Sequence, residues 1–249
     1  MSHLIGDTDN HKANDGVIPS GRWGEECFAD KNLIEHNLLD IKEKIAPCKP
    51  RIIGVTKYFG LNAIVEGYKA GLRDFGESRA LDAIKKINLL PNEIRENSMF
   101  HFIGHLQSNK VEKVVGYFDY IHSVDSLKIA ISISNVACRL NKRVRVLLQV
   151  NNAREVQKYG YAVEELDKDF SEILKLEGLE VVGFMNMAPL GATDSELKSI
   201  FSDLRKIRDD FEKRFNVKLP ELSMGMSDDY QIAIEEGATM IRIGRKLFK

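Results

Sequence analysis

The chain has 249 residues, with 36 Lys or Arg against 37 Asp or Glu, for a formal net charge of −1. This length suits one large domain or two small ones and allows a full buried core. The near balance of charge argues against a broad nucleic-acid surface. Apolar runs fall short of the roughly 18 residues that suggest a membrane-spanning helix, so we expect no membrane segment.

The first 24 residues form a polar stretch rich in Asp, Asn, Gly and His, without the apolar core of a signal peptide. We expect residues 1–24 to be a loose extension and residues 25–249 to form one domain. The three cysteines, Cys27, Cys48 and Cys138, are far apart and include no CxxC pair. That pattern is typical of reduced thiols, and we expect a cytoplasmic protein.

The first periodic segment places four apolar residues on one helix face: Ile34, Leu38, Ile41 and Ile45. Beyond Pro50, short β-branched runs alternate with amphipathic stretches. The predicted strands cover residues 51–57, 73–76, 99–103, 119–123, 144–150, 179–187, 220–223 and 239–243. Predicted helices between them include 61–70, 78–90, 126–140, 163–177, 194–214 and 228–236.

This β–α alternation implies parallel strands joined by crossover helices. Eight such units in one domain favour a closed (β/α)₈ barrel, the TIM barrel, within the α/β class. An open doubly wound sheet is the alternative. That fold usually carries a GxGxxG motif after its first strand when it binds dinucleotides, and this sequence has none.

Lys57 ends the first predicted strand. By period-2 alternation it shares a face with Ile53 and Val55. If that face points inward, the amine lies among apolar groups at the barrel mouth, where burial favours the neutral form that imine chemistry requires. A solvated lysine just past a strand is the alternative interpretation.

Two glycine-bearing loops follow the seventh and eighth strands, where barrels commonly hold phosphate. The first contains Gly225, Met226 and Ser227, and the second contains Gly244 and Arg245. Glycine lets the backbone approach an anion, and a helix start offers free N–H groups. Ser227 is alternatively a plain helix cap. The two loops together predict a phosphate site.

Arg242 interrupts the apolar eighth strand, and arginine is rarely buried without a partner. It is either one member of a structural ion pair or a guanidinium that faces a ligand. Ser78 follows the second strand, where its side chain could reach the same ligand. His101 and His105 lie on a strand and its loop without the helical HExxH geometry, so we expect no metal site and interpret His101 as a core histidine.

Several segments together resemble the pyridoxal phosphate homeostasis proteins, also called the YggS/PROSC family. The resemblance covers roughly residues 26–248. The matching stretches are GVTK (54–57), FGES (75–78), HFIGHLQSNK (101–110), KYG (158–160), GFMNM (183–187), LSMGMSDDYQIAIEEGATMIRIG (222–244) and LF (247–248). The stretches 101–110 and 222–244 are highly specific as a pair.

The resemblance implies a fold-type III barrel like the N-terminal domain of alanine racemase, with pyridoxal 5′-phosphate (PLP) as cofactor. Lys57 matches the Schiff-base lysine, and Arg242 matches the arginine that faces the pyridine nitrogen. The implied phosphate-binding positions are Ser227, Gly244 and Arg245, with Gly225 and Met226 in the same loop. Ser78 stands where Asn is usual, and Arg245 stands where Thr is usual.

The resemblance favours a PLP carrier in vitamin B6 homeostasis, without strong catalytic activity and with apo PLP-dependent enzymes as possible recipients. We expect a monomer. The alternative is an amino-acid racemase or another PLP enzyme. In alanine racemases a tyrosine from a second domain serves one face of the substrate, and we expect no such domain here because the sequence ends five residues after Gly244. Arg242 can only donate hydrogen bonds, which weakens the electron sink that racemisation uses.

Overall fold

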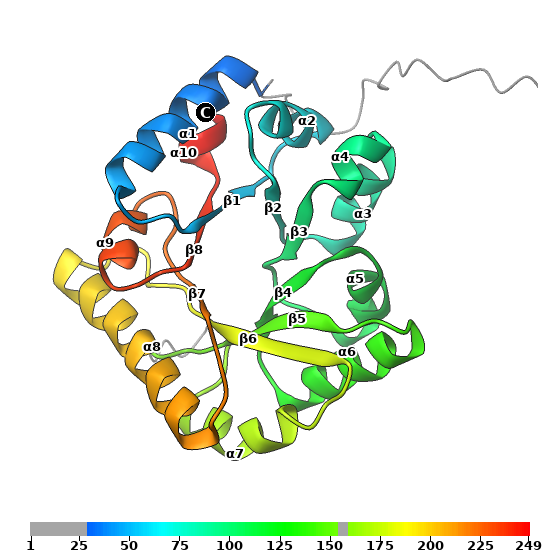
Figure 1. The fold of residues 1–249 in the computed structure, drawn as a ribbon, viewed down its shortest axis with the longest axis vertical. Helices are drawn as coiled ribbons and strands as arrows, with labels where there is room; N and C mark the ends of the chain where they lie inside the picture. The colour runs from blue at the N-terminus through cyan, green and yellow to red at the C-terminus, as the bar shows by residue number, and fades with distance from the viewer. Residues whose placement is uncertain (1–28, 154–158) are drawn as a thin grey trace, which may run out of the picture.

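The structure, a computed structural model, describes residues 29–153 and 159–249. Eight parallel strands close into a barrel in sequence order, and β8 pairs with β1. The helices form an outer ring around the strands (Figure 1). The strands are β1 (Arg51–Val55), β2 (Asp74–Glu77), β3 (Met99–Phe102), β4 (Tyr120–Val124), β5 (Val144–Gln149), β6 (Leu179–Met185), β7 (Glu221–Ser223) and β8 (Met240–Ile243).

The helical elements also follow chain order. They are α1 (Lys31–Ile45), α2 (Leu61–Lys69), α3 (Ala80–Leu89), α4 (Asn92–Glu96), the 3₁₀ turn η1 (Ser108–Lys110), α5 (Val111–Tyr117), α6 (Leu127–Arg139), α7 (Val163–Ile173), α8 (Asp194–Phe215), α9 (Tyr230–Glu235) and α10 (Arg245–Phe248). None of the helices in the two described ranges is long and apolar enough to cross a lipid bilayer.

The predicted barrel is confirmed, and each strand ends within two residues of its predicted limits. Two helical predictions are wrong in detail. Helix α7 ends at Ile173 rather than 177, because the chain turns there to enter β6 at Leu179. Helix α4 is not among the predicted helices, since five residues are too few to show a helical period. The predicted extension over residues 1–24 lies outside the described residues.

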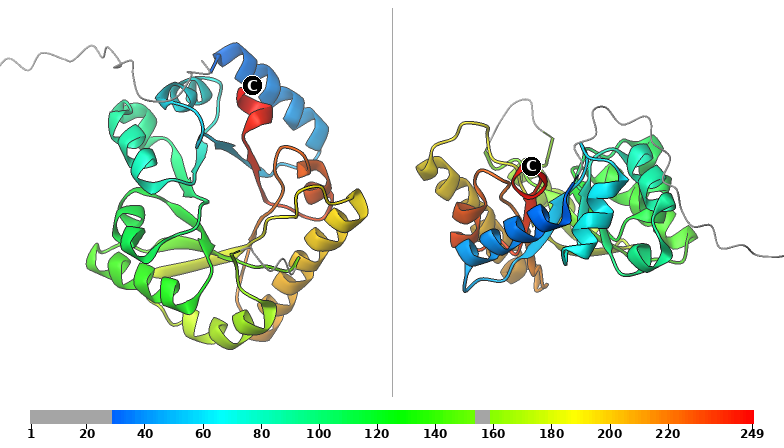
Figure 2. Two further views of the ribbon diagram at one scale, coloured as in Figure 1. Left: turned by 180° about the vertical axis from the view of Figure 1, so that it is seen from behind. Right: turned by 90° about the horizontal axis from the view of Figure 1, so that it is seen from above.

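The first helix closes the ring where the two ends of the barrel domain meet. All four residues of its predicted apolar face are buried. Asp30 caps the helix by accepting a hydrogen bond from the Asn32 N–H at 2.7 Å. Helix α1 lies beside α10, as the two views show from both sides (Figures 1 and 2), and Asn37 Nδ2 donates to Leu247 O at 3.2 Å.

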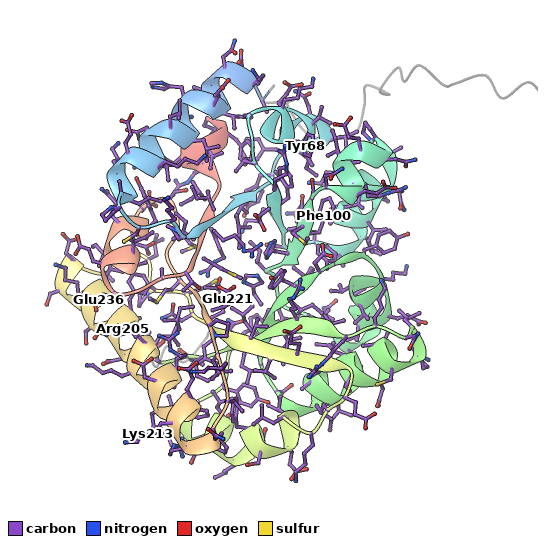
Figure 3. All side chains as sticks on the ribbon, viewed as in Figure 1. Tyr68, Phe100, Arg205, Lys213, Glu221 and Glu236 are labelled. Atoms are coloured by element: carbon purple, nitrogen blue, oxygen red, sulfur yellow. The ribbon has the colours of Figure 1, made fainter. Side chains whose placement is uncertain are left out.

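The longest helix, α8, is fixed to the following unit by a polar contact. Arg205 Nε donates to Glu236 O at 2.9 Å, and Arg205 Nη2 lies 3.2 Å from the Glu236 carboxylate (Figure 3). Since Glu236 is the C-cap residue of α9, the guanidinium also satisfies a carbonyl at the end of that short helix. This contact holds α9, and with it the loop after β7, against the helix ring.

Side chains fill the barrel interior in layers, as expected for a barrel of eight strands. One interior cluster is apolar and includes Ile53, Leu147, Val182 and Met240. The strand register places Ile53 of β1 opposite Arg242 of β8. Arg242 therefore lies beside this apolar cluster in the eighth strand.

Candidate functional site

Lys57 lies two residues after the end of β1, at the carboxyl ends of the barrel strands. Its side chain is partly buried, and Nζ lies 5.0 Å from the centre of the exposed Tyr58 ring. The backbone on either side is held tightly: the Thr56 N–H donates to Gly76 O at 3.0 Å, and the Phe59 N–H donates to Thr56 O at 3.0 Å. The fold thus presents the amine from a fixed turn.

A buried ion pair lies beneath this turn. Lys86 Nζ forms an ion pair with Glu77 and also donates to Thr56 O at 2.9 Å and Phe59 O at 3.2 Å. Thr56 Oγ1 donates to Glu77 Oε1 at 2.7 Å. The ammonium therefore joins the carbonyls on both sides of Lys57 to the end of β2.

This ion pair was not predicted from the sequence, although a signal was present. Lys86 follows Ala83 by three residues on the buried face of α3, and Ile87 lies next to it on the same face. A lysine in an apolar helix face is almost never fully buried unless it is paired. Lys86 is 2 % exposed and Glu77 is 1 % exposed, so both charges depend on this contact.

The loops after β7 and β8 meet, as the sequence predicts. The Gly244 N–H donates to Ser227 Oγ at 3.4 Å, which joins the two loops directly. Gly225 has φ +89°, and a Cβ there would lie 2.6 Å from the Ala233 Cβ, so this position requires glycine. A Cβ placed on Gly244 would lie 3.5 Å from Val55 O, which places this second loop against the strand that leads to Lys57.

The charged side chains of Arg245 and Asp229, beside these loops, are engaged with partners of their own. Arg245 Nη2 pairs with Asp228 Oδ2 at 2.8 Å on the exposed surface, so its guanidinium is engaged outside the loop pair. Its N–H begins the short helix α10, where the first-turn N–H groups have no intrahelical partner. The N-cap residue of α9 is Asp229 and not Ser227. Asp229 Oδ1 accepts a hydrogen bond from the backbone N–H of Met226 at 2.5 Å, and the Met226 side chain is exposed. Ser227 is therefore not required as the cap.

Arg242 is 4 % exposed, and no carboxylate of the described residues lies within ion-pair distance of it. Its Nη1 donates to Ser223 O and to Ser223 Oγ, both at 2.7 Å, and its Nη2 donates to Asn186 O at 2.7 Å. These bonds use three of the five N–H donors of a guanidinium. Burial without a counter-ion lowers the pKa of Arg242 to about 10.

Asn186 lies next to this guanidinium, just after β6. It is 1 % exposed, and its Nδ2 donates to Asn152 Oδ1 at 3.1 Å. Its Oδ1 is buried and accepts no hydrogen bond from the described residues. A buried acceptor without a donor is costly. Together with the unused donors of Arg242, it indicates a place for a polar ligand.

A polar relay continues from Arg242 through the barrel. Ser223 Oγ lies 2.9 Å from His122 Nδ1, and His122 Nε2 lies 2.9 Å from His101 Nδ1. His101 Nε2 lies 3.0 Å from Asp74 Oδ1 at the start of β2. The interpretation of His101 as a core histidine is confirmed, since its ring is fully buried. We call these five residues, from Arg242 to Asp74, the relay.

Ionisation within the relay follows from burial and partners. Burial lowers the pKa of His101 although Asp74 opposes this, and burial lowers the pKa of His122 well below its ordinary value. Burial acts to raise the pKa of Asp74, but hydrogen bonds from His101 and Arg51 outweigh it, so this pKa lies below its ordinary value. Arg51 Nη1 binds the same Asp74 oxygen at 2.8 Å. Both histidines are therefore neutral beside an ionised carboxylate.

We expect the free energy of unfolding to decrease as the pH falls below about 6.5. The unfolded chain takes up protons at its histidines there, whereas the buried rings of His101 and His122 take up fewer, so acid favours unfolding by up to about 1.4 kcal/mol per pH unit for each ring. Urea unfolding between about pH 7 and 5 measures this slope. His122→Asn should reduce the slope, and the same change at exposed His36 should leave it unaltered; equal slopes in all three proteins would contradict the assignment.

Ser78 follows β2, which is separated from β8 by β1 in the barrel. It lines a cavity of about 320 Å³ at the rim, together with Arg79, His105, Gln107 and Lys110. His105 stacks on Tyr159 with ring centres 3.7 Å apart. The structure thus brings Lys57, Ser227, Gly244 and Arg242 to the carboxyl ends of three neighbouring strands, and Ser78 follows the next strand, β2. Within the described ranges no cluster of three or more His, Cys, Asp or Glu side chains could hold a metal ion.

The chain matches two groups of known proteins. Residues 29–249 match the family model described as alanine racemase, N-terminal domain. The pyridoxal phosphate homeostasis protein of Synechocystis sp. strain PCC 6803 is 42 % identical over 202 residues, which span 81 % of this chain and 92 % of that protein. The counterpart in Escherichia coli K12 is 33 % identical over 228 residues, 87 % of this chain and 96 % of that one.

Solved structures agree with these matches. PipY of Synechococcus elongatus PCC7942, solved with PLP bound, superposes with a TM-score of 0.80 at 35 % identity, covering 87 % of this chain and all of PipY. Alanine racemase of Clostridium difficile 630 shares the fold, with a TM-score of 0.71 at 18 % identity over 88 % of this chain and 57 % of the racemase. The chain therefore belongs to the pyridoxal phosphate homeostasis protein family, and its barrel is that of the alanine racemase N-terminal domain.

Proposed function

We propose that this protein binds PLP as a Schiff base on Lys57 and serves in PLP homeostasis. One observation carries the proposal: a partly buried lysine follows β1, whose last residue packs against one of two joined loops that offer N–H and hydroxyl groups, in a barrel of this family. The curated relatives are named for PLP homeostasis, and PipY was solved both with and without PLP.

The residues present fit the three functional groups of PLP. Ser227, Gly244 and the N–H of Arg245 suit a phosphate, with Gly225 and Met226 shaping the loop, and Lys57 suits an aldehyde. The unused donors of Arg242 suit a pyridine nitrogen, because that atom accepts a hydrogen bond when it is unprotonated. Bound PLP supplies an electron-accepting ring.

Arg242 favours holding PLP over amino-acid chemistry. Its guanidinium can donate hydrogen bonds but cannot accept one, so it favours a pyridine nitrogen without a proton and a weaker electron sink. The neutral histidines of the relay leave this guanidinium as the nearby positive charge. Strong racemase activity is therefore not expected. The same proposal includes apo PLP-dependent enzymes as recipients of the cofactor. It also includes a monomeric protein in the cytoplasm, and these three parts are inferred from the sequence.

Ser227→Ala should weaken PLP binding by about tenfold or more, since a hydrogen bond to a charged group contributes roughly 1.5–3 kcal/mol. Pyridoxal, which lacks the phosphate, should be affected much less. Equilibrium titration of both ligands, followed by absorbance, measures the difference. Ser108→Ala, in the exposed turn after β3, is the matched control. An equal loss for PLP and pyridoxal would contradict the phosphate assignment.

A carrier should release PLP without losing its fold, because the core comes from apolar strands and helices. The PLP-free protein should unfold cooperatively, and PLP at 100 times its Kd should raise the free energy of unfolding by about 2.7 kcal/mol.

The protein should not racemise amino acids at the rate of an enzyme. Incubation with L- or D-alanine, followed by chiral chromatography, should show a turnover well below about 1 s⁻¹, the lower end of typical enzyme rates. Faster turnover that Lys57→Ala abolishes would establish an enzyme instead.

A further inference from the structure

The relay has a donor-only group at one end and an acceptor-only group at the other. Arg242 Nη1 can only donate to Ser223 Oγ, so the Ser223 hydroxyl proton is free to point at His122 Nδ1. Asp74, ionised and paired with Arg51, can only accept from His101 Nε2. While both rings are neutral, the three groups between these ends, Ser223, His122 and His101, have one arrangement of protons that fits both ends.

That arrangement fixes both imidazole tautomers. Ser223 donates to His122 Nδ1, so the proton of neutral His122 is on Nε2 and is donated to His101 Nδ1. His101 in turn carries its proton on Nε2 and donates it to Asp74. A second proton on His101 would set its Nδ1–H against the Nε2–H of His122, and a second proton on His122 would turn the Ser223 hydroxyl away, so this arrangement holds while both rings are neutral. All three donors in the interior point from Arg242 toward the carboxylate.

We propose that Asp74, at the amino ends of the strands, is a positioning residue for Arg242 and acts on it through His101, His122 and Ser223. The carboxylate orients the whole chain of donors, so that Ser223 Oγ presents its lone pairs to the guanidinium. This holds Arg242 in the orientation that leaves its remaining donors for a ligand. The orientation of the relay does not depend on PLP; only its consequence for the cofactor rests on the proposed function.

Packing around the relay supports a fixed geometry. The His101 ring stacks on Tyr120 with centres 4.6 Å apart and an interplanar angle of 9°. Tyr120 lies between two guanidinium groups, Arg51 at 5.5 Å and Arg145 at 5.3 Å from the ring centre. His122 is fully buried and meets His101 edge-on at 5.1 Å. These contacts restrict rotation of both imidazoles, so reorientation of the relay requires a change of proton positions.

Nitrogen NMR of the PLP-free protein, labelled with ¹⁵N at histidine and arginine, tests the relay directly. At neutral pH we expect the Nε2–H tautomer at both His101 and His122, and separate, slowly exchanging Nη signals for Arg242. Asp74→Asn replaces the acceptor-only group by a carboxamide that can also donate. We expect a second histidine tautomer to appear and the Arg242 signals to shift or merge. Unchanged signals, or an Nδ1–H tautomer in the unaltered protein, would overturn the proposal.

Two further variants separate this coupling from a general structural effect. Asp119→Asn removes a carboxylate near His101 that lies outside the relay and accepts from the Phe100 N–H at 2.8 Å; it should leave the Arg242 signals unchanged. Ser223→Ala interrupts the relay next to Arg242 and leaves the Asp74–Arg51 pair in place. In that background Asp74→Asn should no longer affect Arg242, and a shift that persists would show that Asp74 acts by another route.

The cofactor arm uses the absorbance spectrum of the PLP-loaded protein. Asp74→Asn should shift the absorbance of bound PLP, whereas Asp119→Asn should not. If PLP does not bind to Lys57, the proposed function fails, but the NMR result in the PLP-free protein still decides the relay. If PLP binds with an unchanged spectrum in Asp74→Asn, the effect of Asp74 on the cofactor is refuted even where the tautomers change.

Discussion

Lys86→Met is expected to destabilise the protein by about 3–5 kcal/mol, because it removes one partner of a buried ion pair and leaves the other charge uncompensated. Glu77 is 1 % exposed, and apart from Lys86 it accepts from Thr56 Oγ1. The carbonyls of Thr56 and Phe59 also lose their hydrogen bonds from Lys86, although the Thr56 carbonyl keeps the one from the Phe59 N–H. Chemical unfolding followed by circular dichroism measures the loss.

The surface offers a matched control for this substitution. Lys175 pairs with Glu172 at 2.7 Å, and both side chains are more than half exposed. Lys175→Met should change the free energy of unfolding by no more than about 1 kcal/mol, as exposed pairs generally do. The double variant Lys86→Met with Glu77→Gln should recover part of the stability, because it removes the isolated charge. A loss at Lys86 no greater than at Lys175 would contradict the role of this pair.

Lys57→Ala is expected to abolish covalent retention of PLP, from close to one PLP per chain to none after borohydride treatment. The loops after β7 and β8, which we propose hold the phosphate, follow other strands and should still bind PLP reversibly, so weak non-covalent binding should remain. Lys57→Arg retains a positive charge but cannot form the imine, and it should behave like Lys57→Ala. That comparison separates imine chemistry from simple charge attraction.

Lys110 provides the control for this second prediction. It lies at the end of the turn after β3, at the same end of the barrel, and lines the rim cavity. Lys110→Ala should retain covalent PLP at the level of the unaltered protein. Equal losses in the Lys57 and Lys110 variants would show that lysines at this rim are labelled without selection.

The barrel and its loops were predictable from local patterns. The strands and the glycine-bearing loops were predicted from short β-branched runs and glycines, which are patterns among neighbouring residues. Gly225 is required by the positive φ at its own position in the loop. The placement of Lys57 at the barrel mouth was predicted by extending the alternation of the first strand to residue 57, although β1 itself ends at Val55. Such features need no knowledge of which strands meet across the barrel.

The relay was not predictable in the same way. Asp74, His101, His122 and Ser223 come from four strands and are separated by up to 149 positions, since 223 − 74 = 149. Their contacts exist only once the sheet has closed, and each residue alone is compatible with an ordinary core or surface position. The sequence interpretation of Arg242 left two roles open, and neither included Ser223 as its partner.

Borohydride reduction followed by peptide mapping tests the central claim most directly. A lysine that carries reduced PLP should resist trypsin, so cleavage after Lys57 should fail. We predict one labelled peptide spanning residues 52–69, with the pyridoxyl-phosphate mass on Lys57, in place of the separate peptides 52–57 and 58–69. A label on a different lysine, or complete cleavage after Lys57 with no label in any peptide, would contradict the assignment of Lys57 as the PLP-binding residue.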